Sequence, residues 1–173
     1  AFNALKNLTL AGTTLYFAAD DGNGMKLWKS TGTYARTVMV TQSVFEPESL
    51  TNANGTLYFS AYTVSHGREL WKTNGTAEST VLVKDVRPGN GGSNPVEITH
   101  INGTIYFAAH DGKTGQEIWK TNGTAGGTAL VKDIRPGASL SSVPESLTNV
   151  NGTLFFVAND GSTGRELWKS NGT

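Results

Sequence analysis

The sequence predicts an all-β fold made of four similar units of about four antiparallel strands each, and three observations support this prediction. An octapeptide that contains Leu-Trp-Lys or Ile-Trp-Lys recurs four times in the 173 residues. Around its copies, short runs rich in Val, Ile, Leu, Thr, Tyr and Phe alternate with Gly, Asn, Asp and Pro, as strands alternate with turns. No stretch of the chain has the apolar period of an amphipathic helix.

The octapeptide sets the phase of the repeat. Its copies are KLWKSTGT at 26–33, ELWKTNGT at 69–76, EIWKTNGT at 117–124 and ELWKSNGT at 166–173. Successive tryptophans are 43, 48 and 49 residues apart, and a glycine lies four residues before and four residues after each of them. Self-similarity at this period is typical of solenoids, propellers and other repeat arrays. The chain is therefore expected to be one repeat domain with units 3–47, 48–96, 97–144 and 145–173.

The strands of a unit are predicted in a constant order. The first strand is expected in segments 49–55, 97–103 and 146–152. The second is expected in segments 14–19, 56–61, 104–109 and 153–158. The octapeptide is the third strand, and the fourth is expected in segments 37–40, 80–86 and 128–134. Asn-Gly steps between the first two strands supply the positive φ angles of a type I′ turn, which predicts an antiparallel hairpin.

Proline and glycine mark the passage from one unit to the next. The RPG segments at 87–89 and 135–137 end the fourth strand, and the loops that follow end at Pro95 and Pro144. Four short antiparallel strands in about 48 residues match one blade of a β-propeller better than any other repeat class. A β-sandwich is the alternative, but it does not predict four copies of one sequence. The first unit has SVFEP in place of RPG, as an end unit would.

The last unit ends at Thr173, before the segment that forms the fourth strand in the other units. We therefore expect a β-propeller-type repeat whose last unit lacks its final strand. Such a sheet edge has unpaired N–H and C=O groups, which recruit strands from other chains. The sequence predicts self-association through this incomplete unit, by strand exchange, by head-to-tail contact or by continuation into further residues.

The repeated motifs resemble those of the ELWxxDGT repeat family. GRELWKSNGT, GTALVKDIRPG and PESLTNVNGTLFF carry the resemblance, which covers nearly the whole chain. It implies a propeller-like β architecture and an extracellular or cell-surface setting, and it implies no catalytic residue. The Asp of the family motif is replaced here by Asn74, Asn122 and Asn171, and by Thr31 in the first unit.

Composition and charge exclude several kinds of partner. Lys plus Arg and Asp plus Glu both number 14, so no net field attracts nucleic acid or an acidic membrane surface. Cysteine is absent, which excludes disulfides, thiolate metal sites and a cysteine nucleophile. No apolar run approaches 18 residues, so membrane insertion is not expected.

The sequence predicts no catalytic residue, no metal site and no cofactor. His66, His100 and His110 share no repeat position and no ligand spacing. Asp21, Asp111 and Asp160 each begin an Asp-Gly step, but their loops have too few carboxylates for calcium, so these residues are interpreted as turn formers. The glutamates two residues before Trp are expected to form cross-strand charge pairs with arginines such as Arg68 and Arg165. These glutamates are Glu69, Glu117 and Glu166.

The four tryptophans are the candidate ligand-binding residues, namely Trp28, Trp71, Trp119 and Trp168. Strand alternation places Trp71 on one face with Glu69 and Thr73, and an indole with polar neighbours can stack on a sugar. The alternative is that the tryptophans pack between blades as core residues. Seven asparagines are formal N-glycosylation acceptors, and six of them coincide with turns of the repeat. They are Asn7, Asn54, Asn74, Asn102, Asn122, Asn151 and Asn171.

The regular positions of the repeat are taken up by packing and turns, so we expect a non-catalytic extracellular β-propeller repeat module for binding, adhesion or assembly. One alternative is a multivalent lectin with about one glycan site per blade. A second is a structural subunit of a surface filament, and a third is an enzyme that uses the irregular first unit.

Overall fold

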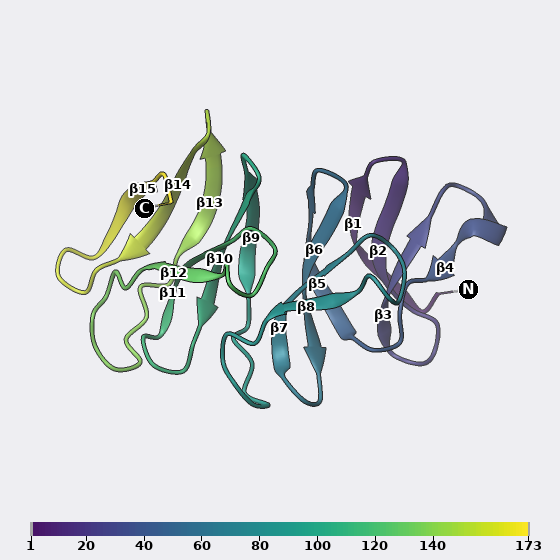
Figure 1. Ribbon diagram of the computed structural model, residues 1–173, viewed down its shortest axis with the longest axis horizontal. Coiled ribbons are helices and arrows are strands. Elements are labelled where there is room, and N and C mark those ends of the chain that lie inside the picture. The colour runs from purple at the N-terminus through teal and green to yellow at the C-terminus, as the bar shows by residue number, and fades with distance from the viewer. Residues whose placement is uncertain (1, 173) are drawn as a thin grey trace.

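The computed structural model describes residues 2–172, which form four antiparallel sheets and no α-helix (Figure 1). The first sheet contains β1 (Ala4–Ala11), β2 (Thr14–Asp20), β3 (Met25–Ser30) and β4 (Val38–Met39). The second contains β5 (Phe45–Ala53), β6 (Thr56–Thr63), β7 (Gly67–Thr73) and β8 (Val81–Lys84). The third contains β9 (Val96–Ile101), β10 (Thr104–His110), β11 (Gln116–Thr121) and β12 (Ala129–Lys132). The fourth contains β13 (Glu145–Val150), β14 (Thr153–Asn159) and β15 (Arg165–Ser170), and one 3₁₀ turn, Tyr34–Arg36, precedes β4.

Each sheet is a meander, because strands that are adjacent in the sequence are also hydrogen-bonded neighbours. This confirms the prediction of an all-β chain with four antiparallel, blade-like sheets. Three sheets have four strands, and the fourth has three strands within residues 2–172.

The Asn-Gly turns between first and second strands have the predicted geometry. The φ angles of Asn54 and Gly55 are 51° and 89°, and the two equivalent pairs are also positive at both residues. A side chain two residues before the turn accepts a hydrogen bond from its glycine N–H, as Asn52 does from Gly55 at 2.9 Å. His100 takes this role in the third sheet, where its Nε2 accepts from Gly103 at 3.0 Å.

A β-bulge in the first strand of every sheet was not predicted. Four residues of the first strand lie opposite three of the second, for example Val96 to Thr99 opposite Tyr106 to Ala108. The residue after the start of each bulge has a left-handed backbone, and these residues are Asn7, Ser49, Glu97 and Ser146, with φ between 52° and 58°. The bulge increases the local twist and bends the strand.

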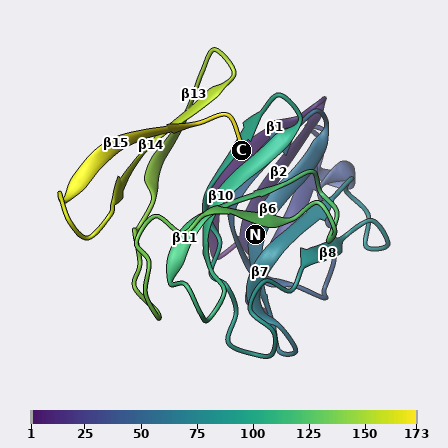
Figure 2. The ribbon, with the colours of Figure 1, turned by 60° about the vertical axis from the view of Figure 1, so that its left-hand side comes forward.

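The four sheets follow one another in a row from the N-terminal end to the C-terminal end, as Figures 1 and 2 show. The first strands of successive sheets contact one another, β1 with β5, β5 with β9 and β9 with β13. Three separate apolar cores fill the spaces between successive sheets. In a β-propeller, too, the face of each blade packs against the face of the next blade. Within residues 2–172, the first and fourth sheets each have one face without a neighbouring sheet.

The predicted charge pairs of Glu69 and Glu117 are wrong, because both side chains are fully buried and bind the loop that follows the fourth strand. The Glu69 carboxylate accepts from the N–H groups of Val86 at 3.3 Å, Arg87 at 3.2 Å and Ser93 at 2.9 Å, and from the Ser93 hydroxyl at 2.5 Å. Desolvation by burial raises the pKa of Glu69 even though these hydrogen bonds lower it. Glu69 therefore holds the loop that leads to the next sheet.

Glu117 repeats this arrangement in the third sheet. Its carboxylate accepts from the N–H groups of Ile134 at 3.0 Å and Ser142 at 2.9 Å, and from the Ser142 hydroxyl at 2.6 Å. Burial raises the pKa of Glu117, and the nearby charge of Asp133 raises it further. In the first sheet Lys26 stands at this position and its Nζ donates to the Gln42 carbonyl at 3.0 Å, so the irregular first loop is held by the opposite charge.

The arginines beside these glutamates pair with carboxylates of the first strand instead. Arg68 contacts Glu46 at 2.8 Å and Glu48 at 3.6 Å, and Arg165 contacts Glu145. Glu166 is exposed, in contrast to the two buried glutamates at the same repeat position.

Candidate interaction surface

Two of the four candidate tryptophans are core residues. Trp71 is 8% exposed and packs in the core between the first and second sheets, and Trp119 is 7% exposed in the core between the second and third. Each ring faces the preceding sheet. Each is also opposite a leucine of the fourth strand, Leu82 for Trp71 and Leu130 for Trp119. Neither ring face is open to a ligand.

The other two tryptophans are half-buried. Trp168 packs against the core between the third and fourth sheets, and its Nε1–H donates to the Ala158 carbonyl at 3.2 Å. The described part of the fourth sheet has no fourth strand, so Trp168 has no leucine opposite it. Trp28 occupies the same position in the first sheet and faces away from the second sheet. The ring of Phe2 lies on it edge to face, with 4.8 Å between centroids.

Three contacts recur in the space between successive sheets, and the first joins the inner strands. The hydroxyl of a first-strand threonine donates to a carbonyl of the next first strand. Thr9 donates to Leu50 at 3.1 Å, Thr51 to Ile98 at 2.8 Å and Thr99 to Leu147 at 3.2 Å. These bonds fix the register of one sheet on the next.

The second recurring contact joins a tyrosine to the glycine of the Gly-Thr turn in the next sheet. A Cβ on Gly75 would overlap the Tyr16 hydroxyl, because the tyrosine oxygen occupies the space beside the glycine. The same relationship joins Tyr58 to Gly123 and Tyr106 to Gly172. A lysine accompanies the tyrosine, and Lys120 Nζ donates to the Gly172 carbonyl.

The third recurring contact is made by an aliphatic residue of the third strand. Leu27, Leu70 and Ile118 are 0%, 1% and 1% exposed because the next sheet covers them. Their counterpart in the fourth sheet is Leu167, which is 72% exposed. The sequence did not single out this position, although comparing the four copies of the octapeptide places Leu167 in register with three core residues.

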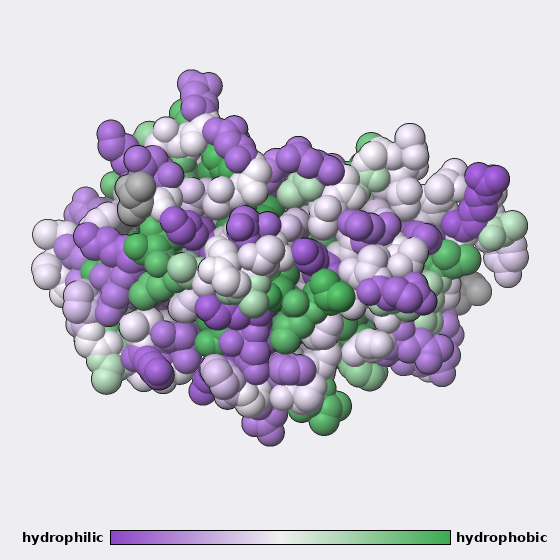
Figure 3. Space-filling view, in the orientation of Figure 1, coloured by the Kyte–Doolittle hydropathy of each residue, from purple (hydrophilic) through white to green (hydrophobic). Residues whose placement is uncertain are grey.

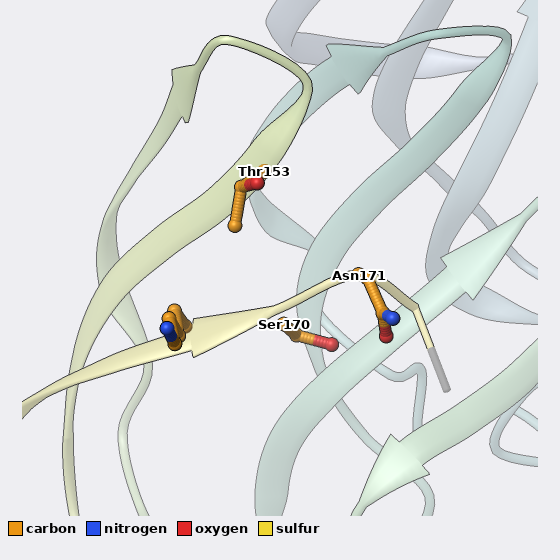
Figure 4. Close-up of a pocket in the computed structure, with 4 residues that line it drawn as sticks. Thr153, Ser170 and Asn171 are labelled. Carbon is orange, nitrogen blue, oxygen red and sulfur yellow. The ribbon is translucent and has the colours of Figure 1, made fainter.

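The outer face of the fourth sheet thus presents one half of the contact that joins the sheets. We call it the tail face and define it by Thr148, Val150, Phe155, Leu167 and Lys169. Val150 and Leu167 are exposed, and Phe155 is half-buried. A neighbouring hollow of about 450 Å³ is lined by Thr153 of β14, by Lys169 and Ser170 of β15 and by Asn171. Figure 4 shows how Thr153, Ser170 and Asn171 lie around it.

The outer face of the first sheet presents the other half. We call it the head face and define it by Phe2, Leu15, Phe17, Trp28 and Gly32. Leu15 is half-buried, whereas its counterparts Leu57, Ile105 and Leu154 are at most 1% exposed. No atom of the described chain lies within 4 Å of a Cβ placed on Gly32, so the space that tyrosines fill elsewhere is open here. A recess of about 540 Å³ adjoins this face, lined by residues including Phe2, Trp28, Tyr34 and Asp21.

Apolar side chains also reach the surface elsewhere, in small patches among polar ones. Figure 3 shows such patches over the middle of the row and toward both of its ends. The two end faces differ from these patches because their residues occupy positions that are buried in the other sheets.

The predicted turn-forming acids bind their own loops. Asp111 Oδ1 accepts from the N–H groups of Lys113 and Thr114, both at 2.8 Å, and Asp160 Oδ1 accepts from Ser162 at 2.8 Å and Thr163 at 2.9 Å. Burial raises the pKa of Asp111, but the hydrogen bonds and the charge of His110 outweigh it and the net shift is downward. The carboxylates are thus engaged in their turns.

Residues 2–172 contain no group of three His, Cys, Asp or Glu side chains arranged to hold a metal ion. His66 Nδ1 lies 2.8 Å from the Ser65 hydroxyl, and His110 Nδ1 accepts from the Gly112 N–H at 2.7 Å. All seven sequon asparagines are exposed. No helix in the described part of the chain is long and apolar enough to span a membrane.

No family model matches the chain, and no curated protein sequence matches it. Solved structures do match. A mutant of puromycin hydrolase complexed with PGG aligns with a TM-score of 0.67 at 13% identity, covering 98% of this chain and 27% of that one. Puromycin hydrolase itself aligns with a TM-score of 0.67 at 12% identity, over 99% and 27% of the two chains.

A structure of a prolyl endopeptidase is also similar, with a TM-score of 0.62 at 12% identity over 93% of this chain and 23% of that one. The chain spans about a quarter of the length of these structures. Identities this low show the fold alone. The similarity agrees with an all-β chain in a propeller-like layout of blades.

Proposed function

We propose that the chain is a non-catalytic β-propeller-type repeat module that works in binding and assembly through the two outer faces of its row of sheets. The observation that carries this proposal is the 72% exposure of Leu167 at a position where the other three sheets bury their side chain. Leu167 shares this sheet face with the exposed Val150 and the half-buried Phe155. A contiguous apolar patch of this kind marks an interaction site.

The polar residues of the repeat support a role without catalysis. Glu69 and Glu117 hold connecting loops, Asp111 and Asp160 close turns, and Thr51 joins neighbouring sheets. A catalytic site needs unlike groups converging in one hollow, with a nucleophile or acid–base pair that has no structural task. The four carboxylates named here are thus engaged in loops and turns.

The proposal includes an extracellular or cell-surface setting and an adhesive or filament-forming role. The resemblance to ELWxxDGT repeats supports the setting. The balance of 14 basic and 14 acidic residues supports a partner that is neither nucleic acid nor a charged membrane surface.

Clustering of coated beads tests the proposal. Beads that carry the wild-type chain in single copies, attached too far apart to pair on one bead, should cluster, and beads that carry Leu167→Glu should stay dispersed because a carboxylate on the tail face opposes burial. Val64→Glu is the matched control, since Val64 is similarly exposed but lies in a loop between β6 and β7. Dispersed wild-type beads, or turnover of peptide, ester or glycoside substrates by the chain, would contradict the proposal.

A second candidate is a glycan site at the head face. The recess beside Trp28 is lined by the aromatic rings of Phe2 and Tyr34 and by the carboxylate of Asp21, a combination suited to stacking on a sugar and accepting its hydroxyl protons. A glycan array should then show binding that Trp28→Ala abolishes and Tyr62→Ala, on an exposed ring elsewhere, leaves intact. An array without any hit rejects this candidate.

A further inference from the structure

We propose that the tail face binds the head face of a second copy of this chain, and that two copies close head to tail into a ring of eight sheets. This inference rests on the proposed function and names the partner. It follows from the contacts that join the sheets within one chain, which the two end faces offer in complementary halves.

The first of the three recurring contacts, between the inner strands, can form between two copies. Thr9, Thr51 and Thr99 each donate a hydroxyl proton to a carbonyl of the next first strand. Thr148 occupies the same position in the fourth sheet, and within the described chain its hydroxyl donates only locally, to the Ser146 carbonyl at 2.9 Å. The residue equivalent to the acceptors Leu50, Ile98 and Leu147 is Leu8, which is exposed on β1. Thr148 of one copy is thus matched to the Leu8 carbonyl of the other.

The aliphatic residue of the third strand can make the second contact between copies, one that buries apolar side chains. Within the chain, Leu27 packs against the face that holds Leu57, Phe59 and Trp71. Leu167 is the equivalent of Leu27, and the equivalents of the other three are Leu15, Phe17 and Trp28 on the head face. Docking would bury Leu167, which is 72% exposed, and Leu15, which is half-buried, as their counterparts in the other sheets are buried.

The Gly-Thr turn after the third strand can make the third contact between copies. Each Gly-Thr turn within the row lies under an aromatic ring of the preceding sheet, as Gly172 lies under Tyr106. Gly32 has the same left-handed backbone, with φ of 97°, and nothing over it. Phe155 is the ring that would cover it, and Lys169 is placed to donate to its carbonyl as Lys120 does to Gly172. Phe155 lacks the tyrosine hydroxyl, which leaves this contact apolar.

The number of sheets favours a closed ring. A contact between unlike faces closes into a ring if the rotation completes a circle and otherwise forms an open fibre. Two copies of the four sheets supply eight, and propellers typically have about four to eight blades. In a pair of these 173-residue chains, the second copy would use both end faces of the first at once.

Phe2 covers part of the head face, so Leu167 would pack beside its ring. Its ring lies on Trp28 and, at 5.8 Å between centroids, on Phe17. The recess between Phe2, Trp28 and Tyr34 remains as the space for side chains of the tail face. A ring that already lies on the tryptophan enlarges the apolar surface available to Leu167.

Light scattering after size exclusion tests this proposal on the 173-residue chain. The wild type should have twice the 18.3 kDa of one chain, Leu167→Glu should have the mass of one chain, and Val64→Glu should keep the double mass. Circular dichroism and thermal melting of each variant check that it is folded. Single-chain mass of the wild type at every concentration would overturn the proposal, as would a double mass that Leu167→Glu leaves unchanged.

The outcomes separate this inference from the proposed function. A wild-type mass that grows with concentration without reaching a plateau, together with clustering beads, would overturn the ring and leave a filament-forming module. Single-chain mass with clustering beads would mean that the faces bind one another only when many copies are presented together, and it would overturn the ring. Single-chain mass with dispersed beads would overturn both.

Discussion

The hydroxyl of Tyr58 lies so close to Gly123 that a Cβ there would overlap it, and this close approach repeats between every pair of successive sheets. It explains why the Gly-Thr turn keeps its glycine. The residue must adopt a left-handed backbone, with φ of 88° at Gly123, and it must also leave room for a ring from the preceding sheet.

Gly123→Ala should destabilise the chain more than Gly32→Ala. Both alanines are strained by a left-handed backbone, at a cost of about 1 kcal/mol. Only the alanine at 123 also collides with the Tyr58 hydroxyl, and overpacking of this kind costs about 1–3 kcal/mol more. Urea unfolding of the two variants measures the difference. Equal losses would mean that the tyrosine does not constrain the turn.

Glu69→Ala should destabilise the chain by about 3 kcal/mol or more, because three loop N–H groups and the Ser93 hydroxyl lose their acceptor in a buried site. Glu166→Ala is the matched control at the same repeat position. Its side chain is exposed, so the free energy of unfolding should change by less than about 0.5 kcal/mol. A loss at Glu166 comparable to that at Glu69 would contradict the role assigned to burial and the loop.

Stability should fall as the pH rises just above 4.5, the ordinary pKa of a glutamate. Burial raises the folded-state pKa of Glu69 and Glu117, so between 4.5 and these raised values the folded chain binds more protons than the unfolded chain. The pKa values of Asp111 and Asp160 are lowered, so these two groups change the stability only below pH 3.8, outside this window.

Unfolding by urea at a series of pH values measures this slope. The slope should be shallower in Glu69→Gln than in the wild type, whatever the absolute stability of the variant, because one of the two groups no longer titrates. A slope unchanged by the substitution would show that Glu69 does not titrate in this window.

Trp71→Ala should lower the free energy of unfolding by about 3–5 kcal/mol, as expected for removing a large ring from a core. Trp28→Ala should cost less, since one side of its ring lies outside the cores between sheets. Thermal melting compares the two. A variant at Trp71 as stable as the wild type would place that ring outside the core and revive its role as a ligand contact.

Much of the fold followed from local sequence. The strands and the type I′ turns were predictable because β-branched and aromatic residues, and Asn-Gly steps such as Asn102-Gly103, act over a few residues. The bulges at residues such as Ser49 and Glu97 were not, since no glycine marks their left-handed backbone.

The roles of the repeated polar residues depend on contacts distant in sequence. Alternation placed Glu69 on the same face as Trp71, but the partner of Glu69 is a loop 17 to 24 residues away. Alternation also could not tell which tryptophans a neighbouring sheet would cover. The positions of Leu167 and Phe155 were readable from the aligned copies, yet their meaning appears only when the sheets are stacked.

The most direct test of the central claim, that the head face binds the tail face, is the mass of a mixture of two variants. Leu15→Glu blocks the head face and Leu167→Glu blocks the tail face, so each variant alone should scatter light as a single chain. Their mixture retains one intact head and one intact tail, and it should form a two-chain species that dissociates at higher concentration than the wild-type pair. A mixture that stays single-chain, or a variant that pairs with itself, would contradict the claim.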